Sequence, residues 1–215
     1  MGKTIFFDLD GTLTDSAPGI INSVAYALEK MGHLPMTRAE LAYFVGPELT
    51  KAFGEKCGYD KETALRAIGF FREYFTDKGM WENSPYPGVR ELLTKLRDAG
   101  FILRVATSKP TVFAERILER FELLPCFSRI DGAPLDESQS GDKDTVLAAA
   151  LRDLPAAPGS LIVGDRKYDV NAGKKNGLLT VAVTYGYGSP EELNACRPDF
   201  TVPTVAALER LLLSL

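Results

Sequence analysis

Two carboxylates near the start of the chain have types and spacing suited to chemistry. Asp8 and Asp10 directly follow an apolar run at residues 5–7, which is typical of a buried strand. An unpaired buried charge is costly, so carboxylates at the end of such a strand indicate a cation, a hydrogen-bond network or a shifted pKa. The plainer alternative is that both are turn or cap residues.

Three further stretches supply hydroxyls, an ammonium and two more carboxylates. These are Thr107 with Ser108, then Lys143, then Asp165 with Asp169. Each has a plainer reading by itself: a helix cap, a solvated lysine, and an N-cap with an exposed partner. Because all of them end a predicted strand or begin the helix after it, four such coincidences in this order are improbable together.

The chemistry of the four stretches is complementary. Carboxylates with no histidine or cysteine nearby form a hard, all-oxygen site, which suits Mg²⁺. Thr107, Ser108 and Lys143 offer a hydroxyl, backbone N–H groups and a compact cation for phosphoryl oxygens. Positioning and charge neutralisation of this kind are what phosphoryl transfer requires.

An alternation of strands and helices must bring these side chains together. Short apolar runs predict strands at 4–9, 101–108, 160–165, 178–184 and 199–202, and amphipathic segments predict helices at 89–99, 112–124, 144–154 and from about 205. The sequence SPEE at 189–192 is typical of a capping box. This order predicts an α/β fold with a parallel sheet, whose carboxyl ends share one edge.

Residues 16–81 depart from this alternation. They contain helical patterns and many aromatic side chains but no strand run, which is too long for an ordinary connection. We therefore expect two domains: an α/β core of residues 1–15 and 82–215, and a helical insert of residues 16–81 over the ligand-binding edge. The aromatic side chains are expected to form the insert's core rather than to stack on a nucleobase.

Composition excludes several classes of function. Hydrophobic residues make up 45% and charged residues 25% of the 215 residues, and the net charge is −4, which argues against a general nucleic-acid binder. There is no membrane-length apolar run and no signal-peptide pattern. Three scattered cysteines and a single histidine, His33, argue against a disulfide framework, a zinc site or Ser-His catalysis. We expect a cytoplasmic protein.

At this point the sequence resembles the haloacid dehalogenase superfamily of phosphohydrolases over its whole length. DLDGTLTDS resembles the family's first motif, Thr107 its second, Lys143 its third and GDRKYD its fourth. The insert is similar to the family's first type of cap. VGPEL, SKP and the segment from GDRKYD to SPEEL resemble the phosphoglycolate phosphatase-like branch.

The resemblance implies a mechanism. Asp8 would attack phosphorus and form an aspartyl-phosphate, and Asp10 would act as general acid and then as general base. Mg²⁺ would be held by Asp8, Asp165 and the backbone carbonyl of Asp10, with Asp169 directly behind or bridging through water. Phosphoryl oxygens would be bound by Thr107, Ser108 and Lys143. The expected partner is a small phosphate ester, without nucleic acid or membrane, and the expected state is a monomer or homodimer.

Substrate and reaction class are less well determined than the mechanism. The branch also contains 5′-nucleotidases and pyrophosphatases, and we expect phosphoglycolate first and 5′-mononucleotides second, with Lys51 as a candidate for a second anionic group. A sugar-phosphate mutase remains an alternative. Asp10 argues against a dehalogenase, the insert against a phospho-accepting signalling domain, and the complete motifs against a silent binding protein. Arg166 and Lys167 stand where many members have small or hydroxyl residues.

Overall fold

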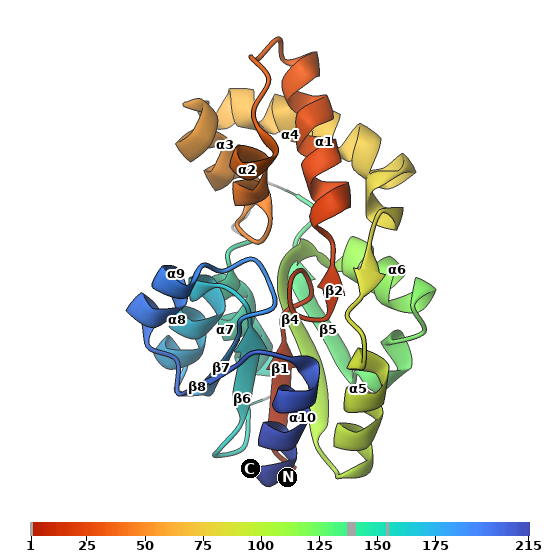
Figure 1. Ribbon diagram of the computed structural model, residues 1–215, viewed down its shortest axis with the longest axis vertical. Helices are drawn as coiled ribbons and strands as arrows, with labels where there is room; N and C mark the ends of the chain where they lie inside the picture. The colour runs from red at the N-terminus through yellow and green to blue at the C-terminus, as the bar shows by residue number, and fades with distance from the viewer. Residues whose placement is uncertain (1, 137–140, 154) are drawn as a thin grey trace.

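The computed structural model describes residues 2–136, 141–153 and 155–215. Within these residues the chain forms a six-stranded parallel sheet with helices on both faces and a helical insert beyond one end (Figure 1), which confirms the expected α/β fold. The strands of the sheet are β1 (Thr4–Phe7), β4 (Ile102–Pro110), β5 (Arg129–Ala133), β6 (Leu161–Gly164), β7 (Leu179–Val183) and β8 (Phe200–Val202).

The order of the strands determines where a ligand can bind. The sheet runs β5-β4-β1-β6-β7-β8, so the chain first builds outward from β1 through β4 and β5. It then crosses to the other side of β1 and continues through β6, β7 and β8. Ligands of open α/β sheets bind at the carboxyl ends of the strands where this reversal occurs. Here that position is the end of β1, between β4 and β6.

The central strand β1 is buried on both faces. Ile5 and Phe7 pack with the side chains of α5, α6 and α10, whereas Phe6 packs on the other face with α7 and α8. All three side chains are 0% exposed, which explains why the strand is apolar without alternation. The helices around the sheet are α5 (Val89–Asp98), α6 (Thr111–Arg120), α7 (Lys143–Asp153), α8 (Lys167–Lys175), α9 (Pro190–Cys196) and α10 (Val205–Ser214), with the short helix η3 (Leu124–Cys126).

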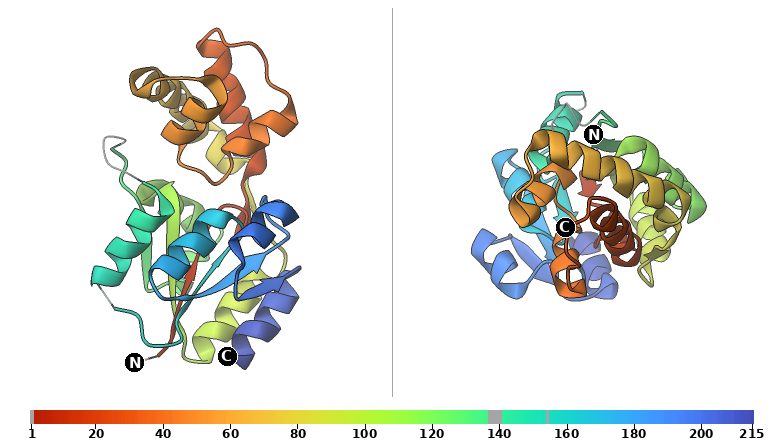
Figure 2. Two further views of the ribbon diagram at one scale, coloured as in Figure 1. Left: turned by 90° about the vertical axis from the view of Figure 1, so that its left-hand side faces the viewer. Right: turned by 90° about the horizontal axis from the view of Figure 1, so that it is seen from above.

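A helical insert lies between β1 and β4, over the carboxyl ends of the strands (Figures 1 and 2). The rings of Phe44, Phe53, Phe71 and Phe75 are buried and contact one another in pairs, so they do contribute to the insert's core. Its helices are α1 (Ala17–Lys30), α2 (Arg38–Leu41), η1 (Ala42–Phe44), α3 (Leu49–Cys57), α4 (Lys61–Asp77) and η2 (Gly79–Trp81).

The chain enters and leaves the insert through two neighbouring segments. β2 (Thr14–Asp15) leads into α1, and β3 (Ser84–Pro85) follows η2. The two pair as a short antiparallel ladder, Thr14 with Pro85 and Asp15 with Ser84. The expected boundaries of the insert, 15/16 and 81/82, remain a prediction about domain division.

Some expected elements were wrong in extent, and one strand was missed. β5 was missed because Arg129 and Asp131 interrupt its apolar pattern; Asp131 is buried and pairs with Arg104 of β4. The helix expected at 112–124 ends at Arg120, because Glu122 adopts a left-handed conformation with φ 52°. The strand expected at 4–9 ends at Phe7, where the chain turns out of the sheet.

Part of one expected helix and of the loop before it lies outside the described residues. Position 154, the expected end of one helix, and positions 137–140 before it lie outside the residues that the structure describes. Within the described residues, no helix is long and apolar enough to cross a membrane, and the three cysteines are free thiols.

The packing of α1 on η2 at the base of the insert gives a test of the fold. A Cβ added at Gly19 would lie 1.8 Å from the carbonyl oxygen of Gly79, so Gly19→Ala must force backbone apart. We expect it to lower the free energy of unfolding by about 1–3 kcal/mol. A Cβ at Gly69 in α4 meets nothing within 4 Å, so Gly69→Ala is the matched control. It should be neutral or stabilise by up to about 1 kcal/mol.

Urea unfolding of the two variants and the wild type measures this difference. Equal midpoints for Gly19→Ala and the wild type would contradict the close approach of α1 to η2.

Candidate phosphoryl-transfer site

The residues that the sequence singled out lie together at the carboxyl end of β1. Asp8 directly follows β1, Asp165 directly follows β6, and Asp169 lies in the first turn of α8. Thr107 and Ser108 lie near the end of β4, and Lys143 is the first residue of α7. The strand reversal at β1 therefore gathers all four stretches of sequence at one place.

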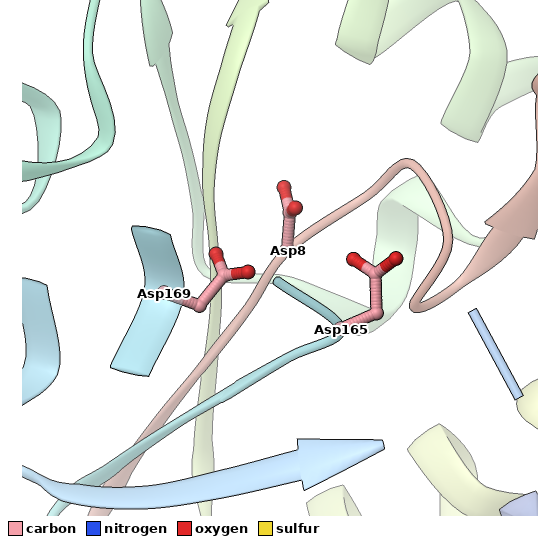
Figure 3. Close-up of side chains that lie close together, drawn as sticks. All are labelled: Asp8, Asp165 and Asp169. Carbon is pink, nitrogen blue, oxygen red and sulfur yellow. The ribbon is translucent and has the colours of Figure 1, made fainter. Parts of the chain in front are cut away.

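Three of the carboxylates form a buried cluster. Asp8, Asp165 and Asp169 are 4%, 0% and 1% exposed, and each offers one oxygen within 4.8 Å of the others. Figure 3 shows these side chains approaching from three separate segments of backbone. The donors are all carboxylate oxygens, which suits a hard divalent cation. In addition, Asp165 Oδ1 is buried without a hydrogen-bond partner among the described residues, as expected of an atom that ligates a metal.

Lys143 is the cation that the fold places against this cluster. Its Nζ lies 2.6 Å from Asp8 Oδ1 and 2.9 Å from Asp169 Oδ1, and it donates to the carbonyl oxygen of Ala106 at 2.8 Å. The Lys143 side chain is 3% exposed, and these three contacts fix its ammonium. When all three carboxylates are ionised, one lysine leaves two net negative charges, the amount that a divalent cation neutralises.

Burial and mutual repulsion change the proton affinities of these groups. Burial, reinforced by Asp169 and Asp10 against the opposing effect of Lys143, raises the pKa of Asp8 to about 6. Burial and then the charges of Asp169 and Asp8 raise the pKa of Asp165 well above its usual range. For Lys143, burial alone lowers the pKa, but the two neighbouring carboxylates outweigh it and raise the pKa above its usual value. The cluster is thus short of positive charge.

Asp10 lies beside the cluster and has a lysine partner that the sequence analysis missed. Asp10 Oδ2 is 3.0 Å from Nζ of Lys109, and both side chains are buried. The Lys109 ammonium also lies over the ring of Phe75 from the insert, 4.9 Å from its centroid. The signal was available, because Lys109 directly follows Ser108, but no role had been assigned to it.

Thr107 and Ser108 lie where the regular pairing of β4 with β5 ends. The register of β4 on β5 shifts between Thr107 and Pro110. Thr107 is 1% exposed, and its Oγ1 accepts a hydrogen bond from the backbone N–H of Lys109 at 3.2 Å. Both Thr107 and Ser108 line the pocket described below.

A second missed feature is the segment after β7 that surrounds Asp165. The backbone N–H of Tyr187 donates to Asp165 Oδ2 at 2.7 Å. A Cβ at Gly186 would lie 2.4 Å from Cβ of Asp165, and one at Gly188 would lie 2.1 Å from its carbonyl oxygen. Two glycines spaced around Tyr187 are therefore required for this contact, and that spacing was the signal in the sequence.

A pocket opens from these residues toward the insert. The space between its walls is about 770 Å³ when the part open to solvent is counted. Core residues Asp8, Asp10, Thr107, Ser108 and Lys109 form its polar end. Apolar and charged side chains line the rest, among them Ile20, Phe44, Leu49, Phe71, Arg72, Phe75 and Phe113.

Several known proteins are similar to this chain in sequence. A 5′-nucleotidase of Pseudomonas aeruginosa is 38% identical over 208 residues, covering 97% of this chain and 94% of that protein. The tyrosine-protein kinase PtkA of Mycobacterium tuberculosis is 41% identical over 210 residues, covering 95% of this chain and 69% of the kinase. A phosphoglycolate phosphatase of Vibrio cholerae is 30% identical over 219 residues, covering 98% and 97% of the two chains.

The crystal structure of a predicted phosphatase from Clostridium acetobutylicum superposes with a TM-score of 0.95 at 43% identity, and the match covers 100% of both chains. Residues 5–183 match the family of haloacid dehalogenase-like hydrolases. That match includes every motif from Asp8 to Asp169, together with the helical insert. The chain therefore belongs to the haloacid dehalogenase-like hydrolases.

Proposed function

We propose that this protein hydrolyses small phosphomonoesters with the help of Mg²⁺, through a covalent phosphate on Asp8. The observation that carries the proposal is the position of the Asp8 carboxylate. It belongs to the carboxylate cluster, is held by Lys143 at 2.6 Å, and lines the pocket that opens toward the insert. The Asp8 carboxylate thus contacts both the Lys143 ammonium and the pocket in which a substrate would bind.

The metal would be held by Asp8, Asp165 and the backbone carbonyl of Asp10, with Asp169 acting through a water molecule. The unpartnered Oδ1 of Asp165 and the two net negative charges of the cluster support this assignment. Bound Mg²⁺ would offset the charge of the carboxylates and of the phosphoryl oxygens. Asp169 fits an indirect role, because its Oδ1 forms an ion pair with Lys143 and its Oδ2 accepts from the backbone N–H of Arg166.

The two oxygens of Asp8 have different surroundings. Among the described residues, the contacts of this carboxylate involve Oδ1, which accepts from the Leu9 N–H at 2.7 Å and from Lys143. Oδ2 is then the oxygen that attacks phosphorus. The attack forms the Oδ2–P bond and breaks the bond from phosphorus to the leaving oxygen. Thr107, Ser108 and Lys143 would bind the remaining phosphoryl oxygens.

Asp10 would handle the protons of both steps. It would give a proton to the leaving alcohol and then take one from the water that attacks the phosphorylated Asp8. Its place on the pocket wall, two residues from Asp8, supports this assignment, as does its buried Oδ1, which has no hydrogen-bond partner among the described residues. Lys109 would hold the other oxygen in place.

We propose 5′-nucleotides ahead of phosphoglycolate as substrates, the reverse of the order expected from the sequence. Phe44, Phe71 and Phe75 of the insert line the space above the polar end, which suits a leaving group with a flat apolar part. Lys51, the expected contact for a second anionic group, does not line the pocket; it lies 4.0 Å from Glu55 and over the ring of Tyr168. A two-carbon carboxylate would leave most of the apolar wall unused.

Substitution of the proposed nucleophile tests the mechanism. Asp8→Asn keeps the shape and removes one buried charge, so the protein should fold, while kcat should fall at least about 10³-fold. Asp77→Asn, an exposed carboxylate at the end of α4, is the matched control and should retain full activity. Phosphate release and circular dichroism measure the two properties. Activity of Asp8→Asn within tenfold of the wild type would exclude Asp8 as the nucleophile.

Substitution of Asp165 tests the metal site without any need for turnover. In EDTA, Asp165→Asn should raise Tm by at least about 2 °C, because it removes a buried charge for which the described residues provide no ion pair. Mg²⁺ should raise the Tm of the wild type but not that of Asp165→Asn. Asp153→Asn, which removes a carboxylate paired with Arg129 outside the cluster, should keep the Mg²⁺ effect. Equal Mg²⁺ effects in all three proteins would refute this metal site.

A substrate panel tests the choice of leaving group. It should contain 5′-mononucleotides, phosphoglycolate, a hexose phosphate and pyrophosphate, and also a phosphotyrosine peptide, because one relative is named a tyrosine kinase. We expect 5′-mononucleotides to exceed phosphoglycolate in kcat/KM by at least about tenfold, or about 1.4 kcal/mol of transition-state stabilisation. Phosphoglycolate in first place would restore the original ranking. Conversion of the hexose phosphate to an isomer without phosphate release would indicate a mutase.

A further inference from the structure

Arg166 occupies the position at which the fourth motif departs from the pattern of many relatives. It lies between Asp165 and the exposed Lys167, yet it is only 6% exposed itself. Its guanidinium and its backbone contact three different parts of the molecule: α9, the helical insert and the carboxylate cluster. A buried, multiply bonded arginine is not a surface charge near the pocket entrance, so its role needs a separate explanation.

The first contact fixes the guanidinium on the core. Nε of Arg166 donates to Oε1 of Glu192 at 2.8 Å, and Nη2 donates to Oε2 at 3.2 Å. This is the bidentate geometry that makes arginine–carboxylate pairs strong and directional. Glu192 was expected to close a capping box on Ser189, but only half of that box forms: Ser189 accepts from the Glu192 N–H, while the Glu192 carboxylate binds Arg166.

The second contact reaches the insert. Nη1 of Arg166 donates to the carbonyl oxygen of Val45. The next residue, Gly46, has φ +105°, and a Cβ there would lie 3.2 Å from Nη1 and 3.3 Å from Cγ of Arg166. Glycine thus allows both the backbone conformation and the close approach. Residues 46–49, which follow directly, all line the pocket.

The third contact uses only the backbone. The N–H of Arg166 donates to Asp169 Oδ2 at 3.1 Å and so supports the carboxylate cluster. Every residue except proline at position 166 keeps this bond. Substitution of the side chain therefore removes the contacts with Glu192 and with the insert but leaves the backbone hydrogen bond to the cluster.

We infer that Arg166 is a positioning residue that holds the loop at residues 45–49 of the insert over the pocket. The inference rests on the proposed phosphatase function, in which substrates enter between insert and core. Opening that path breaks the bond to Val45, while Glu192 keeps the guanidinium aligned for the next closure. Arg166 touches no substrate; it acts by placing the pocket wall against the leaving group.

The test replaces Arg166 by methionine, which fills similar space against Gly46 without hydrogen bonds. Lys167→Met is the matched control, since it removes the same charge from the neighbouring exposed position. The measurement is amide hydrogen exchange of residues 43–51. These amides should exchange faster in Arg166→Met than in the wild type, and at the wild-type rate in Lys167→Met. This readout does not need turnover, so it separates failure of the positioning role from failure of the proposed function.

Kinetics supply the second readout. For 5′-mononucleotides, kcat/KM of Arg166→Met should fall about 10- to 100-fold, the loss of one hydrogen bond to a charged group. Acetyl phosphate, whose leaving group is small, should lose less, and the Mg²⁺ concentration for half-maximal activity should stay within about twofold. Arg166→Lys should recover part of the lost kcat/KM, because an ammonium can bind Glu192 or Val45. It cannot bind both oxygens of Glu192 and the Val45 carbonyl at once as the guanidinium does.

Two results would overturn the inference. One is unchanged exchange of segment 43–51 in Arg166→Met. The other is an equal loss for all substrates together with weakened Mg²⁺ activation, which would mean that the side chain serves only the carboxylate cluster. If no phosphate ester is hydrolysed but segment 43–51 still loosens, the contact stands and the proposed function fails.

Discussion

Three buried carboxylates that repel one another are held together by the backbone that positions them and by the ammonium of Lys143. Asp8 and Asp165 follow adjacent parallel strands whose register fixes their separation. Asp169 is brought in by the first turn of α8, and Lys143 by the first residue of α7. The free energy that this arrangement costs in the absence of a cation becomes free energy of binding when a divalent cation and a phosphate are present.

The sequence singled out residues that lie together in the structure, whereas it predicted the element boundaries less well. Asp8, Asp165 and Lys143 stand out because a charge at the end of an apolar run is locally anomalous. By contrast, β5 contains a buried Asp131 whose partner, Arg104, lies 27 positions away, and local patterns cannot show such a pair. Lys109 and Arg166 were present in quoted motifs, but their partners Asp10 and Glu192 are determined by tertiary structure.

The segment from Tyr185 to Glu192 connects features that are separate in the sequence. The backbone N–H of Tyr187 donates to Asp165. The Tyr187 hydroxyl contacts Asp15 Oδ1 at 2.7 Å and accepts from the Ala17 N–H at the start of α1. Glu192 binds the guanidinium of Arg166. The segment therefore contacts the carboxylate cluster, the connection to the insert and the arginine that reaches the insert. Residues that do not line the pocket therefore contact both the carboxylate cluster and the insert.

The pairing of β2 with β3 determines how the helical insert is joined to the core. Because Thr14 lies opposite Pro85 and Asp15 opposite Ser84, the insert begins and ends at neighbouring points of the core surface. To the core, the whole insert is equivalent to one long hairpin loop, and loop length affects stability only weakly. Because the insert joins the core at two adjacent residue pairs, the intervening helices can change in length or number without a break in any strand of the six-stranded sheet.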